Sequence, residues 1–203
     1  MSKGIKTLLI VVAVIAVLGF GMYSFFAGNY NTMVSMEESV KGQWGQVENV
    51  YQRRFDLIPN LVATVKGYAA HESDVFTGIA EARSKAGGVM NISDEVLNDP
   101  EAFSRFQKAQ GELGSALQRL LMVTENYPEL KANQNFLALQ DQLEGTENRI
   151  TVERQRFNDV VKTYNIFIKQ FPRSFIANMS GFRAKSYFTA DEAAQSAPKV
   201  SFE

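Results

Sequence analysis

The chain has 203 residues, no cysteine and one histidine, and its 21 lysine and arginine residues nearly balance 22 aspartate and glutamate residues. The absence of cysteine excludes disulfides, thiolate nucleophiles and cysteine-ligated metals, and the mildly acidic body does not suit a general nucleic-acid binder. The length allows one ordinary domain and an appendage.

The appendage is a run of 21 residues without a charge, TLLIVVAVIAVLGFGMYSFFA, at residues 7–27. At about 1.5 Å per residue it can cross a hydrocarbon layer of about 30 Å, so we expect a transmembrane anchor over residues 1–28. A cleaved signal peptide is the alternative. It is disfavoured because the apolar region of a signal peptide has only about 7–15 residues, fewer than this run, and ends in small residues at the cleavage site. Here the large residues Phe25 and Phe26 precede the only plausible cleavage site, after Ala27.

The charges on either side of this run predict its orientation. Lys3 and Lys6 precede it, whereas residues 28–40 contain no lysine or arginine and include Glu37 and Glu38. Basic residues favour the cytoplasmic side of a membrane. The N-terminus is therefore expected in the cytoplasm and the rest of the chain outside it.

Residues 29–190 are predicted to be helical almost throughout, because apolar residues recur at spacings of three and four. The first two stripes are Met33, Met36, Val40, Trp44, Val47, Tyr51 and Phe55, and then Leu61, Val65, Tyr68, Ala69, Val75, Phe76 and Ile79. The aromatic residues of the stripes, Trp44 among them, are expected to pack inside. A loop is expected over residues 84–99, where glycine, asparagine and aspartate collect.

Two further helices follow this loop. Asp99-Pro100-Glu101 predicts a helix start, with an acidic N-cap and a proline whose missing N–H does no harm there. The third stripe, which stops before a turn at Tyr127-Pro128, is Phe103, Phe106, Leu113, Leu117, Leu120 and Leu121. The fourth has the seven-residue repeat of a coiled-coil-like seam: Phe136, Leu143, Ile150, Phe157, Tyr164 and Phe171.

Pro59 lies between the first two stripes and predicts a corner. Its ring clashes with the preceding helical turn and it donates no hydrogen bond, so we place it in the first turn of the second helix. Asp56 then lies at the positive N-terminal end of that helix, and Arg53 and Arg54 lie at the negative C-terminal end of the first. These charges favour a structural corner, with a binding role as the alternative.

Four helices joined by short turns favour an up-down-up-down arrangement. The predicted fold is all-α, with an N-terminal transmembrane helix followed by an antiparallel four-helix bundle with long helices. The corner Arg53–Asn60 and the turn Asn126–Glu129 would then meet at the tip far from the membrane. We expect a candidate interaction site for a carboxylate-bearing protein there, formed by Arg53, Arg54, Asp56, Asn60, Asn126 and Glu129.

The same topology places the end of the fourth helix near the bilayer. No acidic residue occurs between Asp159 and Asp191, and basic residues alternate with aromatic ones. Such a segment suits an anionic lipid surface; aromatic residues that cap the open end of the bundle are the alternative. The candidate membrane surface consists of Lys162, Lys169, Phe171, Arg173, Phe175, Arg183 and Lys185.

No catalytic or metal-binding motif is recognisable. His71 is the only histidine, and Tyr68 stands where a Glu-x-x-His di-iron motif needs its glutamate. A histidine-based zinc site or a Ser-His-Asp triad would also have to rest on this one residue. We therefore expect no enzyme, no metal and no cofactor.

Several segments together resemble the LemA family of bacterial membrane proteins, in order, over nearly the whole chain after Gly28. They are YNTMVSMEESVKGQWGQVENVYQRRFDLIPNLVATVKGYAAHE, ENYPELKANQNFLALQDQLEGTENRI, RFNDVVKTYNIFIKQFP, and GFRAKSYF followed by APKVSF. The resemblance implies one N-terminal transmembrane helix and a helical bundle. Members of the family are often assigned an extracellular N-terminus, which is the reverse of the orientation predicted from Lys3 and Lys6.

The expected domains are an anchor at 1–28, a LemA-like helical bundle at 29–190 and a C-terminal tail at 191–203.

The resemblance implies no settled activity. Family members are associated with membrane metallopeptidases of stress response, and one branch is associated with magnetosome membranes. We expect a single-pass protein of the bacterial cell (inner) membrane that acts as a scaffold or adaptor; the alternative is a membrane-shaping or lipid-organising protein that uses the basic aromatic segment. The expected partners are the membrane, a protein such as a membrane metallopeptidase, and further copies of the chain, but no nucleic acid.

Overall fold

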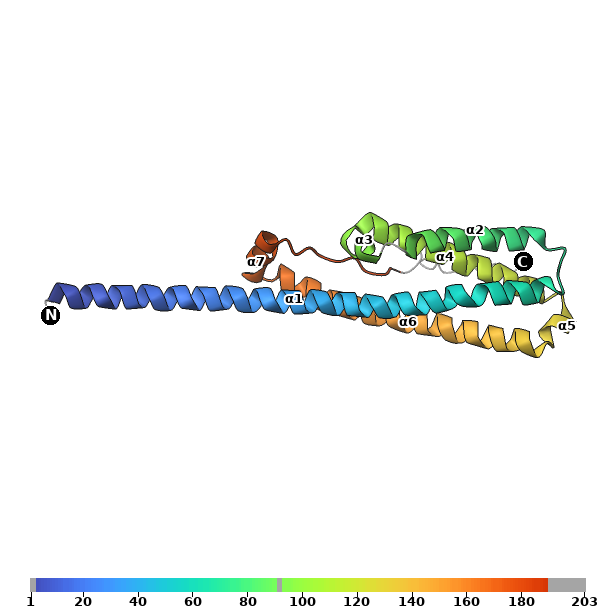
Figure 1. Cartoon of the computed structure of the whole chain (residues 1–203), viewed down its shortest axis with the longest axis horizontal. Coiled ribbons are helices and arrows are strands. Elements are labelled where there is room, and N and C mark those ends of the chain that lie inside the picture. The colour runs from blue at the N-terminus through green and yellow to red at the C-terminus, as the bar shows by residue number, and fades with distance from the viewer. Residues whose placement is uncertain (1–2, 91–92, 190–203) are drawn as a thin grey trace, which may run out of the picture. The chain divides into compact units, whose positions relative to one another are not determined.

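The computed structural model describes residues 3–90 and 93–189, and every regular element in these ranges is a helix (Figure 1). The helices are α1 (Lys3–Lys66), α2 (Ser73–Met90), α3 (Ser93–Asn98), α4 (Pro100–Thr124), α5 (Pro128–Lys131), α6 (Gln134–Lys169) and α7 (Arg173–Ser180). The prediction of a helical chain with one long apolar N-terminal helix is confirmed for these residues. The predicted C-terminal tail at 191–203 lies outside them.

The chain divides into two compact units. Unit 1 consists of Met1–Val40 and Lys162–Ala184, and unit 2 consists of Lys41–Val161 and Lys185–Glu203. The long helices α1 and α6 are each continuous and contribute residues to both units.

The corner predicted at Pro59 is wrong, because α1 continues through this residue to Lys66. A proline inside a helix costs about 3 kcal/mol. Its neighbours offset this cost, because Leu57, Ile58 and Leu61 are all buried, and each buried side chain of this size contributes roughly 1.5–3 kcal/mol. The chain turns between Lys66 and Ser73 instead.

The loop predicted at residues 84–99 is also mostly wrong, because α2 extends to Met90 and α3 occupies Ser93–Asn98. Gly87 lies within α2 and does not mark a turn. A Cβ atom at this position would lie 3.3 Å from the Phe55 ring, so the glycine permits a close approach of α2 to α1.

Two helix starts of unit 2 are fixed by side-chain caps. The predicted start at Asp99 is confirmed, since an Asp99 oxygen accepts the Glu101 N–H at 2.9 Å at the head of α4. Asn133 caps α6 in the same way, and its side-chain oxygen accepts the N–H groups of Asn135 and Phe136 at 2.9 and 3.1 Å. These bonds satisfy N–H groups that have no partner within the helix.

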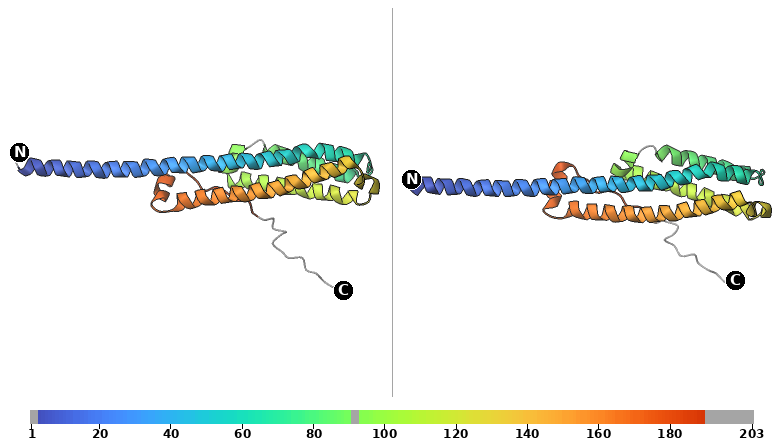
Figure 2. Two further views of the ribbon diagram at one scale, coloured as in Figure 1. Left: turned by 90° about the horizontal axis from the view of Figure 1, so that it is seen from below. Right: turned by 60° about the horizontal axis from the view of Figure 1, so that its bottom comes forward.

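Unit 2 has an apolar core to which several helices contribute. Within it, α2 lies along α4, and α3 packs against α4 (Figure 2). The core residues are Ile58, Leu61, Val65, Ala69, Ile79, Ala82, Ala86, Leu113, Leu117, Leu120, Leu130, Phe136 and Leu143. Trp44 is 2% exposed, so its predicted inward orientation is confirmed.

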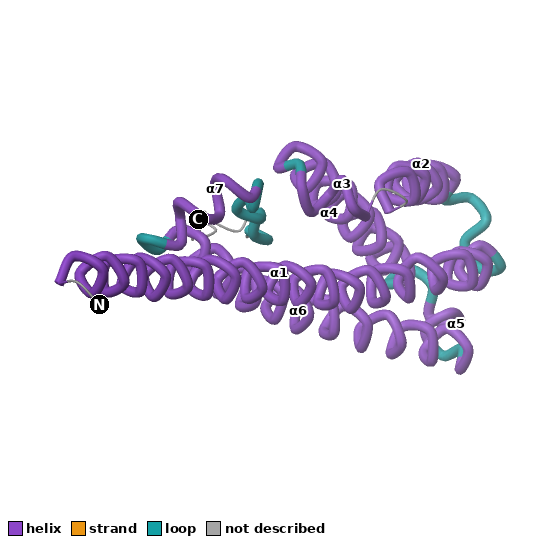
Figure 3. The backbone as a smooth tube through the Cα atoms, turned by 60° about the vertical axis from the view of Figure 1, so that its left-hand side comes forward, coloured by secondary structure: helices purple, strands orange, loops and turns teal. Residues whose placement is uncertain are grey.

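One end of unit 2 gathers the end of α1, the start of α2, and α5 (Figure 3). Two hydrogen bonds join the α1–α2 loop to the segments on either side of α5. The Tyr127 hydroxyl donates to the Glu72 carboxylate at 3.2 Å, and the Asn133 amide donates to the Tyr68 hydroxyl at 2.9 Å. This end of unit 2 is therefore built around Tyr68 and Glu72 and not around the predicted Arg53–Asn60 corner.

Candidate membrane-contact surface in unit 1

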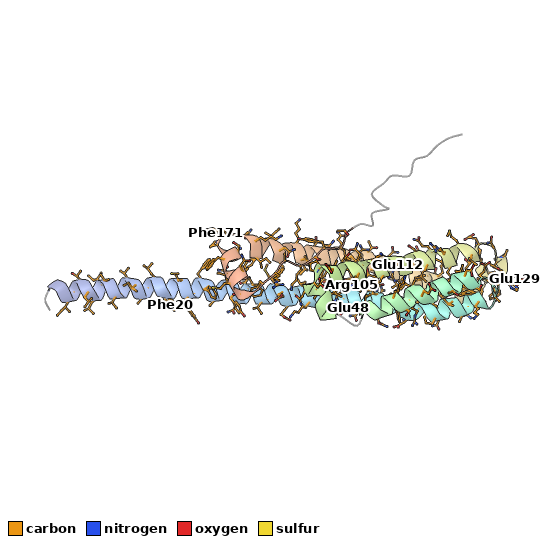
Figure 4. The ribbon with its side chains drawn as sticks, turned by 90° about the horizontal axis from the view of Figure 1, so that it is seen from above. Phe20, Glu48, Arg105, Glu112, Glu129 and Phe171 are labelled. Carbon is orange, nitrogen blue, oxygen red and sulfur yellow. The ribbon has the colours of Figure 1, made fainter. Side chains whose placement is uncertain are left out.

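The N-terminal part of α1 has the composition of a membrane span. Among the helices of the described ranges, only α1 contains a segment long and apolar enough to cross a bilayer. Its large apolar side chains between Ile5 and Phe25 are exposed, and Phe20, labelled in Figure 4, is 73% exposed. Water is a poor environment for so much continuous apolar surface.

A second exposed apolar feature of unit 1 lies on and just before α7. Ile176 and Ala177 are buried on one side of this helix, whereas Phe175 and Met179, four positions apart, are 69% and 61% exposed. Phe171, between α6 and α7, is 90% exposed (Figure 4). We call Phe171, Phe175 and Met179 the exposed apolar row.

Two contacts fix α7 beside α1 just past the apolar segment. The Arg173 Nε–H donates to the Asn29 side-chain oxygen at 3.0 Å, and the rings of Tyr30 and Phe182 meet edge to face with centroids 5.6 Å apart. Because Asn29 follows Ala27 by two residues, α7 lies at the level where a membrane span over residues 7–27 would end.

Arg173 is held from α6 as well as from α1. Its guanidinium lies 4.2 Å from the centre of the Phe167 ring, and its Nη1 donates to the Gln170 side-chain oxygen at 2.7 Å. Arg173 is therefore a structural link at the start of α7, and it remains only partly exposed. A planar cation that stacks on an aromatic ring and donates several hydrogen bonds suits this position.

Most of the other predicted membrane-surface residues are exposed in unit 1. Lys162, Lys169 and Arg183 are exposed, as are the apolar residues named above. Lys185 does not join them: it belongs to unit 2, is 6% exposed and donates from Nζ to the Asn98 side chain at 2.7 Å. Its place in the candidate membrane surface is wrong, because a buried, hydrogen-bonded ammonium cannot face lipid headgroups.

The end of the α7 region is tied back to α6. The buried Tyr164 hydroxyl donates to the Arg183 carbonyl at 3.1 Å. Burial, and secondly the Glu37 carboxylate, raise the pKa of Tyr164 above its ordinary value, so this hydroxyl keeps its proton to a higher pH than an exposed tyrosine does. The chain is thereby held to α6 on both sides of α7, at Arg173 and at Arg183.

The predicted interaction residues do not form one cluster. Arg54 is 3% exposed and donates to the Glu147 carboxylate at 3.1 Å and to the Gln110 side-chain oxygen at 2.5 Å. Arg53 donates to Gln142 at 2.9 Å. Of the six residues, Asp56 and Asn60 are exposed within α1, and Asn126 and Glu129 are exposed next to and within α5.

Sequence reasoning missed α7 as a separate helix. Two features could have indicated it: the four-residue spacing of Phe175 and Met179, and Gly181, which ends the helix in a left-handed conformation with φ +80°. Within the described residues, no three His, Cys, Asp or Glu side chains are grouped so that they could hold a metal ion.

Comparisons with known proteins identify a matching family and several relatives. The model of the LemA family matches residues 43–202. Magnetosome protein MamQ 1 of Paramagnetospirillum magneticum is 29% identical over 203 residues, which cover 93% of this chain and 74% of that protein. Magnetosome protein MamQ of Magnetospirillum gryphiswaldense is 28% identical over the same shares of the two chains.

A more distant relative carries the family's name. Protein LemA of Metamycoplasma hominis is 21% identical over 177 residues, which cover 87% of this chain and 76% of that protein.

Proposed function

Because this chain belongs to the LemA family, we propose that it is a membrane-anchored bacterial scaffold whose unit 1 contacts one bilayer twice. The apolar segment of α1 crosses the bilayer, and the exposed apolar row of α7 enters its surface. The apolar N-terminal helix and the magnetosome relatives are compatible with such an anchored protein.

The observation that carries this proposal is the position of the exposed apolar row. Phe175 and Met179 are exposed on a helix that is hydrogen-bonded to Asn29, two residues beyond the apolar segment. A short amphipathic helix at that level would lie in the headgroup region with its apolar side toward the acyl chains. Lys169 and Arg183, both exposed, would each add about 1 kcal/mol of attraction to an anionic surface.

The scaffold role is supported by the construction of unit 2. Its core draws on α1, α2, α4, α5 and α6. Such a body would present long helix faces to protein partners while α1 and α7 hold it at the membrane. We propose no catalytic step.

The lipid contact can be tested with a single fluorescent reporter, because the chain has no cysteine. Met179→Cys in the full chain is labelled with a fluorophore and reconstituted into vesicles that contain brominated lipids. We expect quenching, since bromine atoms on the acyl chains quench a fluorophore that lies among them. The matched control is Ser39→Cys, an exposed position of unit 1 about 18 Å along α1 from Ala27.

The control should not be quenched. If brominated lipids quench the label of the Met179→Cys protein no more than that of the Ser39→Cys protein, the second membrane contact is contradicted. The anchor would be unaffected by that result, because it is tested separately by retention of the protein in the membrane pellet after a carbonate wash.

A second candidate function, membrane shaping, rests on the same apolar row. A helix that inserts into a single leaflet expands that leaflet relative to the other one. Binding of this kind is sensitive to membrane curvature. If this is the function, vesicles that contain the protein should tubulate or shrink in electron micrographs, and Phe175→Ser with Met179→Ser should restore their shape. Unchanged vesicles would favour the scaffold.

A further inference from the structure

The segment 185–189 runs along α4 without forming a helix or strand. The Lys185 ammonium donates to the Asn98 side chain, just before α4, at 2.7 Å. Three residues later, the Phe188 ring lies 4.9 Å from that of Phe103, in the first turn of the helix. The segment therefore proceeds toward the C-terminal end of α4.

Thr189, the next residue, is held between α4 and α6. The Gln107 amide of α4 donates to the Thr189 carbonyl at 3.0 Å, and Arg154 of α6 donates to the same oxygen at 3.0 Å. Gln107 lies one turn beyond Phe103, so the direction along α4 is kept. A chain that continues in this direction lies between the two helices.

The helix faces that hold this segment extend further between α4 and α6. Gly114 of α4 and Glu147 of α6 lie at one level, because both are next to Nη1 of Arg54. This atom donates to the Glu147 carboxylate at 3.1 Å, and a Cβ atom on Gly114 would be 3.8 Å from it. Gly114 follows Gln107 by seven positions, and Glu147 precedes Arg154 by seven. Residues seven apart lie on nearly the same face of a helix, about 10 Å from each other.

A groove of about 340 Å³ opens between these continuing faces. On α4 it extends from Gly114 to Leu121, which is about 10–21 Å beyond the level of Gln107 at 1.5 Å per residue. Its floor is apolar, and its rim is polar and acidic. The floor is formed by Leu117, Leu121 and Leu143, and the rim by Gln118, Glu144 and Glu147.

Residues 190–203, which follow Thr189 in the sequence, carry groups that are complementary to this groove. Val200 and Phe202 are the only large aliphatic or aromatic residues among them, and Lys199 is the only lysine or arginine. On an extended backbone Val200 and Phe202 lie on one side and Lys199 lies on the other. The apolar side chains can then face the leucines of the floor while the ammonium reaches the acidic rim.

The length of chain between Thr189 and these residues is sufficient. Val200 follows Thr189 by eleven residues. An extended chain spans up to about 3.3–3.6 Å per residue, so eleven residues can span roughly 36 Å. Val200 can therefore reach every part of the groove.

We propose that the groove between α4 and α6 binds residues 198–202, PKVSF, of the same chain. Val200 and Phe202 cover the leucines of the floor, and the Lys199 ammonium faces Glu144 and Glu147. The bound residues form a strap that links α4 to α6 beyond Thr189. A protein partner can enter the groove only when this strap has left it.

The hydrogen bonds of Thr189 favour a strap from the same chain over one from another copy. They hold the start of residues 190–203 at one end of the groove and direct it along the groove. A binding segment that is tethered next to its site has a high effective concentration there. A segment from a second copy lacks this advantage.

The test uses the absence of cysteine from the chain. The full-length protein with Gln118→Cys and Ser201→Cys is purified in mild detergent, kept dilute and treated with a short bismaleimide. We expect an internal crosslink, identified by mass spectrometry of the monomer, because Gln118 lies on the rim of the groove and Ser201 lies between the two apolar anchors. Adding Val200→Ser and Phe202→Ser should abolish this crosslink, and an unchanged circular dichroism spectrum verifies the fold.

The matched control replaces Gln118→Cys by Arg119→Cys. Arg119 is also exposed, but it lines the opposite face of α4, toward α2. Residues 190–203 that are not bound in the groove reach both positions, whereas a bound strap reaches only Gln118. We therefore expect little or no internal crosslink from Arg119→Cys with Ser201→Cys.

Equal yields from the Gln118→Cys and Arg119→Cys proteins would overturn the proposal, and so would a crosslink that persists with Val200→Ser and Phe202→Ser. A second experiment mixes two differently tagged copies, one with Gln118→Cys and one with Ser201→Cys. A crosslinked heterodimer in place of the internal crosslink would assign the groove to a second copy. None of these readouts involves α7 or lipid, so the proposed function stands or falls separately.

Discussion

Arg54 differs from its neighbour Arg53 in a way that the sequence does not reveal. Its guanidinium is buried between α1, α4 and α6 and is bonded to Gln110 and Glu147, while the Arg53 side chain is exposed and bonded to Gln142. Gly114 lies beside Arg54, where a Cβ atom would be 3.8 Å from Nη1. Burial of a charge is costly unless it is paired and hydrogen-bonded.

We expect Arg54→Ala to lower the free energy of unfolding by about 2–3 kcal/mol, since hydrogen bonds of a charged group are lost and Gln110 keeps no partner for its oxygen. Arg53→Ala should cost less than about 1 kcal/mol, as exposed polar contacts do. Denaturant titration of the full chain in mild detergent measures both. Equal losses for the two variants would mean that Arg54 does not act as a buried charge.

Trp44 is at the centre of an aromatic cluster in unit 2 that includes Phe103, Phe106, Phe157 and Phe188. Trp44→Ala should cost about 3–5 kcal/mol, as large-to-small core changes do. Trp44→Phe should cost less than about 1.5 kcal/mol, because it keeps a ring and removes an indole N–H that has no hydrogen-bond partner among the described residues. A loss below about 1 kcal/mol for Trp44→Ala in the same titration would contradict this position in the core.

At the scale of elements, α1 shows how packing can override a local preference. Pro59 is exposed on a helix whose adjacent residues Leu57, Ile58 and Leu61 are buried. The proline ring disfavours a helix at this point, but a break would withdraw these three side chains from the core. The helix therefore continues, and the cost of Pro59 remains in the folded protein.

Pro59→Ala should consequently stabilise the protein. Alanine restores the missing N–H donor, removes the ring clash and is the best helix former, so we expect the free energy of unfolding to rise by about 1–3 kcal/mol. The midpoint of thermal unfolding, followed by circular dichroism at 222 nm, checks this. A lowered midpoint would show that a bend at Pro59 is needed for the packing of Leu57 and Ile58.

For the whole molecule, the charges around the apolar segment predict a cytoplasmic N-terminus and an exterior body. In spheroplasts, Glu129→Cys should react with a membrane-impermeant maleimide added outside, since Glu129 is exposed on α5. Gly4→Cys, which keeps both lysines, should react only after the membrane is permeabilised. The opposite labelling pattern would establish the reverse orientation, with the same two contacts to the bilayer.

The features that the sequence determined by itself are those with a local physical cause. The apolar run of residues 7–27 needs no partner to be identified as a candidate span, and the start of α4 follows from the Asp99 cap. Of the seven-residue repeat predicted from Phe136 to Phe171, the members up to Tyr164 lie within α6 as predicted, whereas Phe171 follows the end of the helix and is exposed. In each case the pattern itself carries the structural preference, through length, capping or periodicity.

The features that only the tertiary structure decided depend on residues far apart in the chain. Continuity through Pro59 depends on the core, and the burial of Arg54 depends on Gln110 and Glu147. The separation of Lys185 from the other basic residues arises because Phe188 enters an aromatic pocket and Asn158 binds its backbone. No local pattern encodes these contacts, since their energies come from desolvation and from bonds between residues that meet only in the folded chain.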